Sequence, residues 1–469
     1  MTEIDVRDPR TGAIDHVIHP PPNDDLAALA QRLRGAQALW EHGGLTARTE
    51  VLMRWREAMA TRRADLVDAL VRDTGRRIES ELEVDAILGS IERWCRMAPD
   101  LLADPEPRPA SIPIFSIRQS MRPYGLAGVI SPWNFPLLLS LIDAIPALVA
   151  GCAVIVKPSE IAPRFVEPLA EMIPADLPLA YIVGAGETGA TLIDLVDVVC
   201  FTGSVPTGRR VGEQAANRFI PAFLELGGKD PAVVLASANL DRATSAILWG
   251  STANSGQSCL SIERIYVEAP VFDPFIDQLV TKAKEIKLAH PTPESGQLGP
   301  IIAEKQVAVI ADHLADAASK GARVHCGGQI QNLDGGSYCG ATVLTGVDHS
   351  MRVMTEETFG PIMPVMKVAD ADEAVRMAND TTFGLSAAVF AGNAEEAIAV
   401  AGRINAGAIS VNDAALTALI YDAEKNSFNF SGLGGSRMGP AALRRFGRRQ
   451  AFLVADLSTP DPWWYPGLR

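Results

Sequence analysis

From residue 123 onward, short apolar segments alternate with helical segments. Leu126–Ile130 and Ala153–Val156 have strand-forming composition, and Leu137–Val149 between them has the length and spacing of a helix. Such a unit joins parallel strands, because an antiparallel pair needs only a short turn. The sequence therefore predicts an α/β fold in which a parallel sheet has helices on both faces. This stretch is also expected to contain a helix at 162–172 and strands at 180–183, 196–201 and 232–235.

A second α/β region is expected after Asp241, and the N-terminal part of the chain is expected to be helical. With 469 residues the chain is too long for one ordinary core, so two or more domains are expected. Asp24 and Asp25 can cap the first helix. The other predicted elements are helices at 46–70, 77–97, 271–286, 305–320 and 372–379 and strands at 264–267, 387–390 and 407–411.

Residues 105–122 interrupt the helical pattern. Prolines between 105 and 113 precede the alternating segment 114–118, which is typical of an edge hairpin. An isolated hairpin is marginally stable unless it pairs with another chain. We therefore predict a protruding hairpin and, as the partner, a second copy of the chain in a homodimer or homotetramer.

Composition argues against several kinds of partner. The chain is 48% hydrophobic and 21% charged, as in globular proteins, and its net charge is −14, which opposes a nucleic-acid surface. The apolar stretch 136–156 contains Asp143, Pro146 and Gly151, so it predicts a buried helix and a core strand, with no membrane span.

The six cysteines are expected to be reduced. The N-terminus is polar and has no apolar signal segment, so we predict a cytoplasmic protein without disulfides. No Cys-x-x-Cys or His-x-x-x-His spacing occurs, and we predict no metal site.

Two short motifs indicate covalent chemistry. Cys259 follows Gly-Gln-Ser, a turn-prone setting that presents a thiol to solvent, and Glu225 precedes Leu-Gly-Gly-Lys, where the backbone can approach a ligand closely. Together they suggest a thiol nucleophile and a general base. A third motif, Ser131–Pro136, places Asn134 between a tryptophan and Phe-Pro.

These motifs and four others, in this order, resemble the aldehyde dehydrogenase superfamily over nearly the whole chain. The resemblance implies an NAD(P)-dependent, non-acylating enzyme with a Rossmann-like cofactor domain, a second α/β catalytic domain and a small β oligomerisation element. The motifs are Pro132–Pro136, Lys157–Glu160, Phe201–Ser204, Glu225–Lys229, Gly256–Cys259, Glu356–Pro361 and Gly407–Asn412. The implied domains are 1–104 with 123–228 for NAD binding, 229–440 for catalysis, and 105–122 with 441–469 for oligomerisation.

The resemblance also implies a role for each candidate catalytic residue. Cys259 would attack an aldehyde carbonyl and form a thiohemiacetal, and the amide of Asn134 would stabilise the oxyanion. Loss of hydride to the nicotinamide leaves a thioester, and Glu225 would activate the water that hydrolyses it. The expected product is a free carboxylic acid.

The cofactor site is expected at the carboxyl ends of the parallel strands. A carboxylate at Glu160 would accept from a ribose 2′-hydroxyl and repel a 2′-phosphate, which favours NAD, whereas the ammonium of Lys157 leaves NADP possible. Gly184–Gly189 satisfies G-x-G-x-x-G, but we predict only an adenine-side contact there, at Gly186. The residues expected at the cofactor are Ile130, Trp133, Lys157, Glu160, Gly186, Gly203, Ser204, Leu226, Glu357 and Phe359.

The substrate pocket is predicted to be apolar. No arginine stands out that would bind the carboxylate of a semialdehyde, so we expect an aromatic or medium-chain apolar aldehyde. The loop 413–430 is expected to contribute to the tunnel, and Asp143 stands near a position where the family often has lysine. The candidate pocket residues are Leu139, Ile142, Ser258, Leu260, Tyr421, Phe428 and Phe430.

Two other functions remain open at this stage. A coenzyme A-acylating relative would usually lack a glutamate at the position of Glu225. A catalytically silent member, used for binding or structure, would be expected to have lost the thiol, the base or the oxyanion amide. This chain has all three residues.

Overall fold

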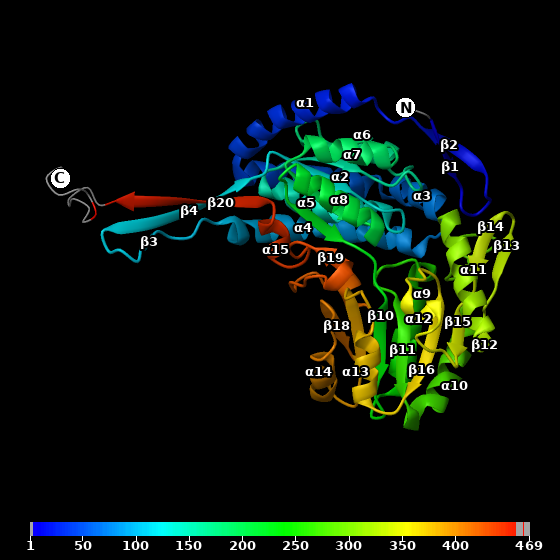
Figure 1. Ribbon diagram of the computed structural model, residues 1–469. Coiled ribbons are helices and arrows are strands. Elements are labelled where there is room, and N and C mark those ends of the chain that lie inside the picture. Colours follow the sequence, from blue (N-terminus) through cyan, green and yellow to red (C-terminus); the bar gives the residue numbers. More distant parts are fainter. Residues whose placement is uncertain (1–2, 456–462, 464–469) are drawn as a thin grey trace.

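The computed structural model describes residues 3–455 and 463, which form two α/β regions and a projecting arm (Figure 1). The first region is built on a six-stranded sheet of order β19-β9-β8-β5-β6-β7. Strands β5 to β9 are parallel and β19 is antiparallel to β9, which agrees with the predicted α/β fold. The strands are β5 Leu126–Ile130, β6 Ala153–Lys157, β7 Leu179–Tyr181, β8 Val198–Thr202, β9 Ala222–Glu225 and β19 Gly432–Leu433.

Both faces of this sheet are buried. Along β8, Val198 and Cys200 belong to one core cluster, and Val199 and Phe201 belong to the cluster on the opposite face. Alternate side chains of a strand point to opposite faces, which explains why the strand reads as a continuous apolar run. The covering helices are α1 Asn23–His42, α2 Gly44–Thr61, α3 Arg63–Thr74, α4 Ile78–Leu102, α5 Pro136–Ala150, α6 Val166–Met172, α7 Gly186–Leu195 and α8 Val205–Asn217.

Three local predictions in this region were wrong. The first helix is capped at Pro22, and Asp24 and Asp25 lie in its first turn without a side-chain cap. The predicted helix 46–70 is two helices that meet at Arg62, whose backbone leaves the helical conformation. The predicted helix 162–172 begins only at Val166.

The second region contains a seven-stranded sheet of order β12-β15-β16-β11-β10-β17-β18. The strand expected near 232–235 belongs to this sheet, beside β11 and β17. Its strands are β10 Asp230–Val234, β11 Ile262–Glu268, β12 Arg323–Cys326, β15 Thr342–Thr345, β16 Ile362–Val368, β17 Ser386–Phe390 and β18 Ala408–Val411. Its helices are α9 Leu240–Thr252, α10 Phe272–Ala283, α11 Glu304–Ser319, α12 Arg352–Thr355, α13 Ala371–Asn379 and α14 Ala394–Ala401.

The chain passes between the two sheets twice. It leaves β9 at Glu225 and enters β10 at Asp230, and it later returns from β18 to β19, where Gly432 pairs with Glu225. Strand β19 therefore joins the first sheet, although it lies within the predicted catalytic stretch 229–440. Both crossings pass the carboxyl end of β9.

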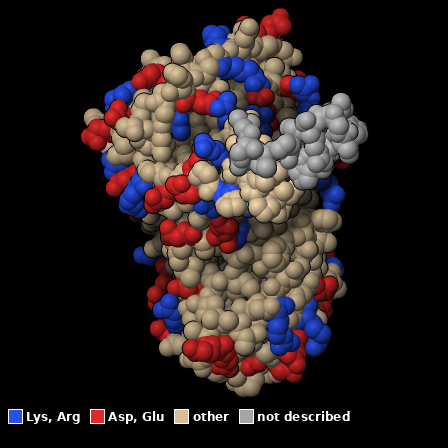
Figure 2. Space-filling model, turned by 90° about the vertical axis from the view of Figure 1, so that its left-hand side faces the viewer, with Lys and Arg blue, Asp and Glu red and all other residues tan. Residues whose placement is uncertain are grey.

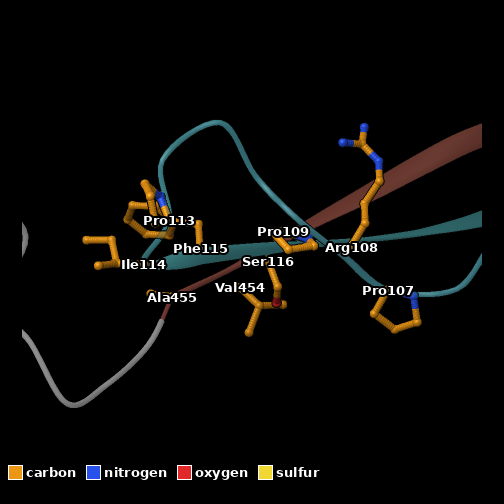
Figure 3. Close-up of a pocket in the computed structure, with 9 residues that line it drawn as sticks. All are labelled: Pro107, Arg108, Pro109, Pro113, Ile114, Phe115, Ser116, Val454 and Ala455. Carbon is orange, nitrogen blue, oxygen red and sulfur yellow. The ribbon is translucent and has the colours of Figure 1, made fainter.

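The arm is a three-stranded antiparallel sheet of order β20-β4-β3. Pairing of β3 (Arg108–Pro109) with β4 (Phe115–Pro123) confirms the predicted hairpin, and β20 (Gly447–Ala455) pairs with β4 along its whole length. Near its tip, Pro113, Phe115 and Val454 line a hollow of about 340 Å³ (Figure 3). Trp463 stacks on Phe115 with ring centroids 5.4 Å apart, and the rest of the tail from 456 onward lies outside the described residues.

Residues just before β20 do not belong to the arm. Helix α15 (Ala441–Arg444) contacts α4 and α5, and Ala442, Leu443 and Phe446 are buried in the first core. The predicted oligomerisation stretch 441–469 therefore begins several residues too early, because these apolar side chains complete the first region. Two small hairpins complete the fold, β1 Ile4–Arg7 with β2 Ile14–Ile18 and β13 Ile330–Leu333 with β14 Gly336–Cys339.

The surface and the helices set limits on partners. On the face seen from the end of the arm, acidic and basic side chains are mixed, and a broad area below the arm is uncharged (Figure 2). Within residues 3–455, no helix is both long and apolar enough to cross a membrane. In the same part of the chain, no three His, Cys, Asp or Glu side chains are grouped so that they could hold a metal ion.

Candidate active site

The candidate site lies at the carboxyl edge of the first sheet. Ile130, Lys157, Thr202 and Glu225 end four neighbouring parallel strands, so they lie along one edge. Beside this edge is a cavity of about 160 Å³ that also contains Cys259. Its lining residues are Pro132, Trp133, Asn134, Leu139, Thr202, Gly203, Ser204, Leu226, Gly227, Cys259, Gln306, Glu357 and Phe359.

The loop that presents Cys259 has an unusual backbone. Asn254, Ser255 and Gly256 have φ values of 53°, 54° and 71°, so three successive residues are left-handed. A Cβ on Gly256 would lie 2.2 Å from the backbone of Gly360, so only glycine fits. The Gln257 carboxamide anchors the loop, because its Oε1 accepts from the N–H of Ile302 at 2.8 Å. This conformation turns the half-buried thiol toward the cavity.

The environment of Cys259 opposes ionisation of the thiol. Burial, together with the carboxylates of Glu357 and Asp230, raises its pKa to about 12, and the nearby ammonium of Lys425 only partly offsets this. Below that pKa, the thiolate fraction rises about tenfold per pH unit. We expect the alkylation rate of Cys259 by iodoacetamide, followed by mass spectrometry, to rise about tenfold per unit from about pH 7 to about pH 9. A rate that levels off below about pH 8 would contradict this environment.

Asn134 is buried and held from three sides. Its Nδ2 donates to the backbone carbonyl of Gln257 at 3.0 Å. The backbone carbonyl of Asn134 accepts from the Arg76 guanidinium at 2.5 Å and from the Asn254 side-chain amide at 2.9 Å. Arg76 is itself paired with buried Glu83 of α4 at 3.1 Å. An amide nitrogen has two N–H groups, so one remains for an oxyanion beside Cys259.

Removing this amide should affect the transition state strongly. We expect Asn134→Ala to lower kcat by about 10²–10³-fold, which corresponds to about 3–4 kcal/mol, because one preorganised donor is lost. Stopped-flow measurement of reduced cofactor tests this, with exposed Asn217→Ala as the control. A decrease of less than about tenfold would remove Asn134 from the oxyanion site.

Glu225 is buried at the end of β9 and has two donors from a distant loop. Its Oε2 accepts from Ser427 Oγ at 2.7 Å and from Lys425 Nζ at 3.2 Å. The residues that the structure describes donate no hydrogen bond to the other oxygen, Oε1. Neither donor was predicted from the sequence, because neither lies in a recognisable motif.

Glu357 and Phe359 lie on a turn that a buried ion pair holds in place. Glu263 pairs with Lys229 at 2.6 Å and accepts from the N–H groups of Thr358 and Phe359 at 2.7 and 2.8 Å. Burial raises the pKa of Glu357 to about 8, with a further contribution from the Glu263 charge. The Phe359 ring meets Trp133 edge-on with ring centroids 5.5 Å apart, so two of the residues expected at the cofactor are brought together. Glu263 was another residue that the sequence patterns did not reveal.

The predicted cofactor residues lie around two helix N-termini. Ser204 occupies the N-cap position of α8, and a Cβ on Gly203 would lie 2.6 Å from the Phe201 ring, so a larger residue there would require that ring to move. Gly186 begins α7, and a Cβ on it would meet no atom within 4 Å. Gly203 and Ser204 at the N-terminus of α8 also line the cavity, and such a helix end suits a phosphate-bearing ligand, so the residues present fit a dinucleotide. Leu226 packs against Gly208 on α8.

Lys157 and Glu160 form an ion pair at the end of β6. Lys157 is buried, and its Nζ lies 3.3 Å from Glu160 Oε2 and 2.9 Å from the carbonyl of Pro158. Burial lowers the pKa of Lys157, although the Glu160 charge opposes that effect. Much of the Lys157 charge is thus engaged within the protein, and Glu160 remains about one-third exposed.

The predicted substrate residues are only partly brought together. Leu139 lines the cavity, and Ser258 and Leu260 flank Cys259. Ile142, Tyr421, Phe428 and Phe430 are not among the residues that line it. Phe430 lies with its ring centroid 4.5 Å from the guanidinium carbon of Arg209 on α8, Phe428 packs beside Gly384, and both side chains are exposed.

Asp143 lies between two arginines. Arg437 donates to it at 2.5 Å, and Arg445 donates to its other oxygen. Although burial opposes ionisation, these guanidinium groups lower the pKa of Asp143. Both basic partners of Asp143 therefore come from the segment that follows β19.

Comparison with known proteins gives a consistent result. Residues 1–451 match the model of the Aldehyde dehydrogenase family. A Mycobacterium ulcerans protein named "Putative succinate-semialdehyde dehydrogenase" with NADP(+) in its name is 35% identical over 98% of this chain and 92% of its own. The 4,4'-diapolycopene aldehyde oxidase of Methylomonas sp is 37% identical over 95% of this chain and 85% of its own. The solved structure of "Putative Aldehyde Dehydrogenase PutA" from Anabaena variabilis has 59% identity and a TM-score of 0.97, covering 99% and 100% of the two chains.

Proposed function

Because the chain belongs to the aldehyde dehydrogenase family of NAD(P)-dependent oxidoreductases, we propose that it oxidises an aldehyde to the free carboxylic acid, with NAD as the preferred cofactor. The observation that carries this proposal is one cavity lined by Cys259, Asn134, Glu357 and Phe359, with the buried carboxylate of Glu225 ending the strand beside it. The six-stranded region would hold the cofactor, and the seven-stranded region would supply the thiol.

Each group has a defined role in this reaction. The Cys259 thiol releases its proton to solvent as its sulfur bonds to the aldehyde carbon, and the free N–H of Asn134 and the N–H of Cys259 donate to the oxyanion. A nicotinamide cofactor, which Ser204, Glu357 and Phe359 would hold, would supply the hydride acceptor. Glu225 then takes a proton from the water that attacks the thioester, and release of the acid restores the thiol.

The choice of NAD rests on Glu160. Its carboxylate would accept a hydrogen bond from a ribose 2′-hydroxyl, whereas a 2′-phosphate would be repelled. Lys157 is the group that could bind that phosphate, and it is already paired with Glu160. The Mycobacterium ulcerans relative carries NADP(+) in its name, so both cofactors belong in any assay.

The substrate is proposed to be an aromatic or medium-chain apolar aldehyde. Leu139 gives the cavity that contains Cys259 an apolar wall, and Lys425 is already paired with Glu225. Two relatives differ on this point, because one is named for a semialdehyde and the other for the aldehyde of a hydrocarbon polyene. The apolar lining favours the second kind of substrate.

A panel of aldehydes tests the function directly. Purified protein is assayed with aromatic, aliphatic and carboxylate-bearing aldehydes, with NAD or NADP, and reduced nicotinamide is followed by absorbance. We expect the highest kcat/KM with an apolar aldehyde and NAD. Failure of every aldehyde with both cofactors would reject the proposal.

An assay with added coenzyme A distinguishes the acylating alternative from the proposed hydrolysis. Glu225 favours water as the acceptor, so the product is expected to be the free acid with and without coenzyme A. A coenzyme A thioester as the main product would support the alternative. The silent alternative gains support only if no aldehyde is oxidised with either cofactor, with or without coenzyme A.

We also propose a homo-oligomer assembled through the arm, and a cytoplasmic location. Strand β20 has an unpaired outer edge among the described residues, and Phe452, Leu453 and Val454 are exposed on it. Light scattering should give a dimer or tetramer mass, and Leu453→Lys should lower that mass. A monomer mass for the unmodified chain would reject the assembly. All six cysteines are free thiols, as suits a reducing compartment.

A further inference from the structure

The loop between β18 and β19 brings a lysine and a serine into contact with Glu225, the proposed base. Lys425 Nζ lies 3.2 Å from Glu225 Oε2, Ser427 Oγ lies 2.7 Å from the same oxygen, and the two donors lie 3.3 Å apart. We propose that Lys425 and Ser427 clamp this oxygen so that Oε1 of Glu225 is the proton acceptor for thioester hydrolysis. The inference rests on the proposed function and makes both residues positioning residues.

The loop that carries the clamp is anchored on both sides. The N–H of Lys425 donates to Ser436 Oγ at 3.0 Å, and Ser436 in turn donates to the carbonyl of Met438 at 2.9 Å. On the other side, the N–H of Leu226 donates to the carbonyl of Ser431 at 2.8 Å. Hydrogen bonds donated by the backbone N–H groups of Lys425 and Leu226 therefore fix the clamp relative to Glu225.

Burial makes this contact costly to break. The Lys425 and Glu225 side chains are 8% and 12% exposed, so neither charge has full access to water. Removing one member would leave the other as an uncompensated buried charge. The pair therefore holds the carboxylate in one orientation, and it engages the lysine that could otherwise bind an anionic substrate.

The geometry assigns different tasks to the two carboxylate oxygens. Oε2 is occupied by two donors, so its lone pairs are poor proton acceptors, whereas Oε1 has no donor among the described residues. During hydrolysis the water oxygen bonds to the thioester carbon and its proton passes to Oε1. The carbon–sulfur bond then breaks, the carboxylic acid leaves, and the proton on Oε1 returns to the sulfur or to solvent.

The test uses 4-nitrophenyl acetate, which needs neither cofactor nor aldehyde. Acylation of the thiol releases 4-nitrophenolate, and the steady rate then reports hydrolysis of the acetyl-enzyme. For Lys425→Met we expect a burst close to one nitrophenolate per chain, a steady rate about 10–100-fold below that of the unmodified protein, and accumulation of acetylated chain in intact mass spectrometry. Ser427→Ala should slow the same step by about 3–10-fold, and Lys425→Arg should restore most of the rate.

A double variant tests whether Lys425 acts through Glu225. In a Glu225→Gln background, Lys425→Met should slow hydrolysis no further. Lys367→Met, at a half-exposed lysine on β16, is the matched control and should hydrolyse the acetyl-enzyme normally.

Other results would overturn the clamp. An unchanged steady rate in both Lys425→Met and Ser427→Ala would do so, as would additive effects in the double variant. If Lys425→Met instead raised KM only for carboxylate-bearing aldehydes, the lysine would be a substrate-recognition residue. The proposed function fails separately, through absence of aldehyde oxidation by the unmodified protein.

Discussion

Cys259→Ala is expected to abolish aldehyde oxidation, with kcat lowered by roughly 10⁴-fold or more. Without the sulfur, no covalent adduct forms, and the oxyanion donors have no tetrahedral species to stabilise. The substitution removes one atom from a half-buried side chain, so the cofactor should bind as before. Steady-state kinetics give the first quantity, and quenching of protein fluorescence on cofactor binding gives the second.

The matched control for this variant is Cys326→Ala. Cys326 is also a half-buried free thiol, but it lies on β12 at the far edge of the second sheet. Its removal should leave kcat and KM unchanged. Turnover that survives in Cys259→Ala, or is lost in Cys326→Ala, would place the nucleophile elsewhere.

Glu225→Gln is expected to stop the reaction halfway. The amide has the size of the carboxylate and can still accept from Ser427, but it cannot take a proton from water. We expect the steady-state rate to fall by about 10²–10⁴-fold, while one rapid equivalent of reduced cofactor still forms per active site. Stopped-flow absorbance resolves the burst from the steady rate.

Exposed Glu213→Gln on α8 provides the control for loss of a carboxylate. It should show the kinetics of the unmodified protein. If Glu225→Gln lost the burst as well, the carboxylate would be needed before hydride leaves, as in activation of the Cys259 thiol. A steady rate within about threefold of normal would exclude Glu225 as the base.

Local patterns identified many of the helices and strands, although they missed helices α7 to α9 and strands β12 to β16. Strands such as β5 and β6 are short apolar runs, and helices such as α5 and α11 have clear helical spacing, so their type follows from residues close together in the chain. Strand β9 was not predicted, because it has only four residues and merges into the Leu-Gly-Gly motif. The strand at 232–235 was predicted, but its place in the second sheet depends on partners at β11 and β17.

The sequence alone predicted the candidate catalytic residues. Cys259, Asn134 and Glu225 each lie in a short motif whose turn-forming neighbours present one reactive side chain, and such motifs can be read without knowledge of the fold. Only the tertiary structure decided which groups surround them. Lys425 reaches Glu225 across 200 positions because the chain returns from the second sheet to pair β19 with β9. No local periodicity encodes that return. The pairing of β19 with β9 joins segments far apart in the chain, so it depends on how the two sheets pack in the folded protein.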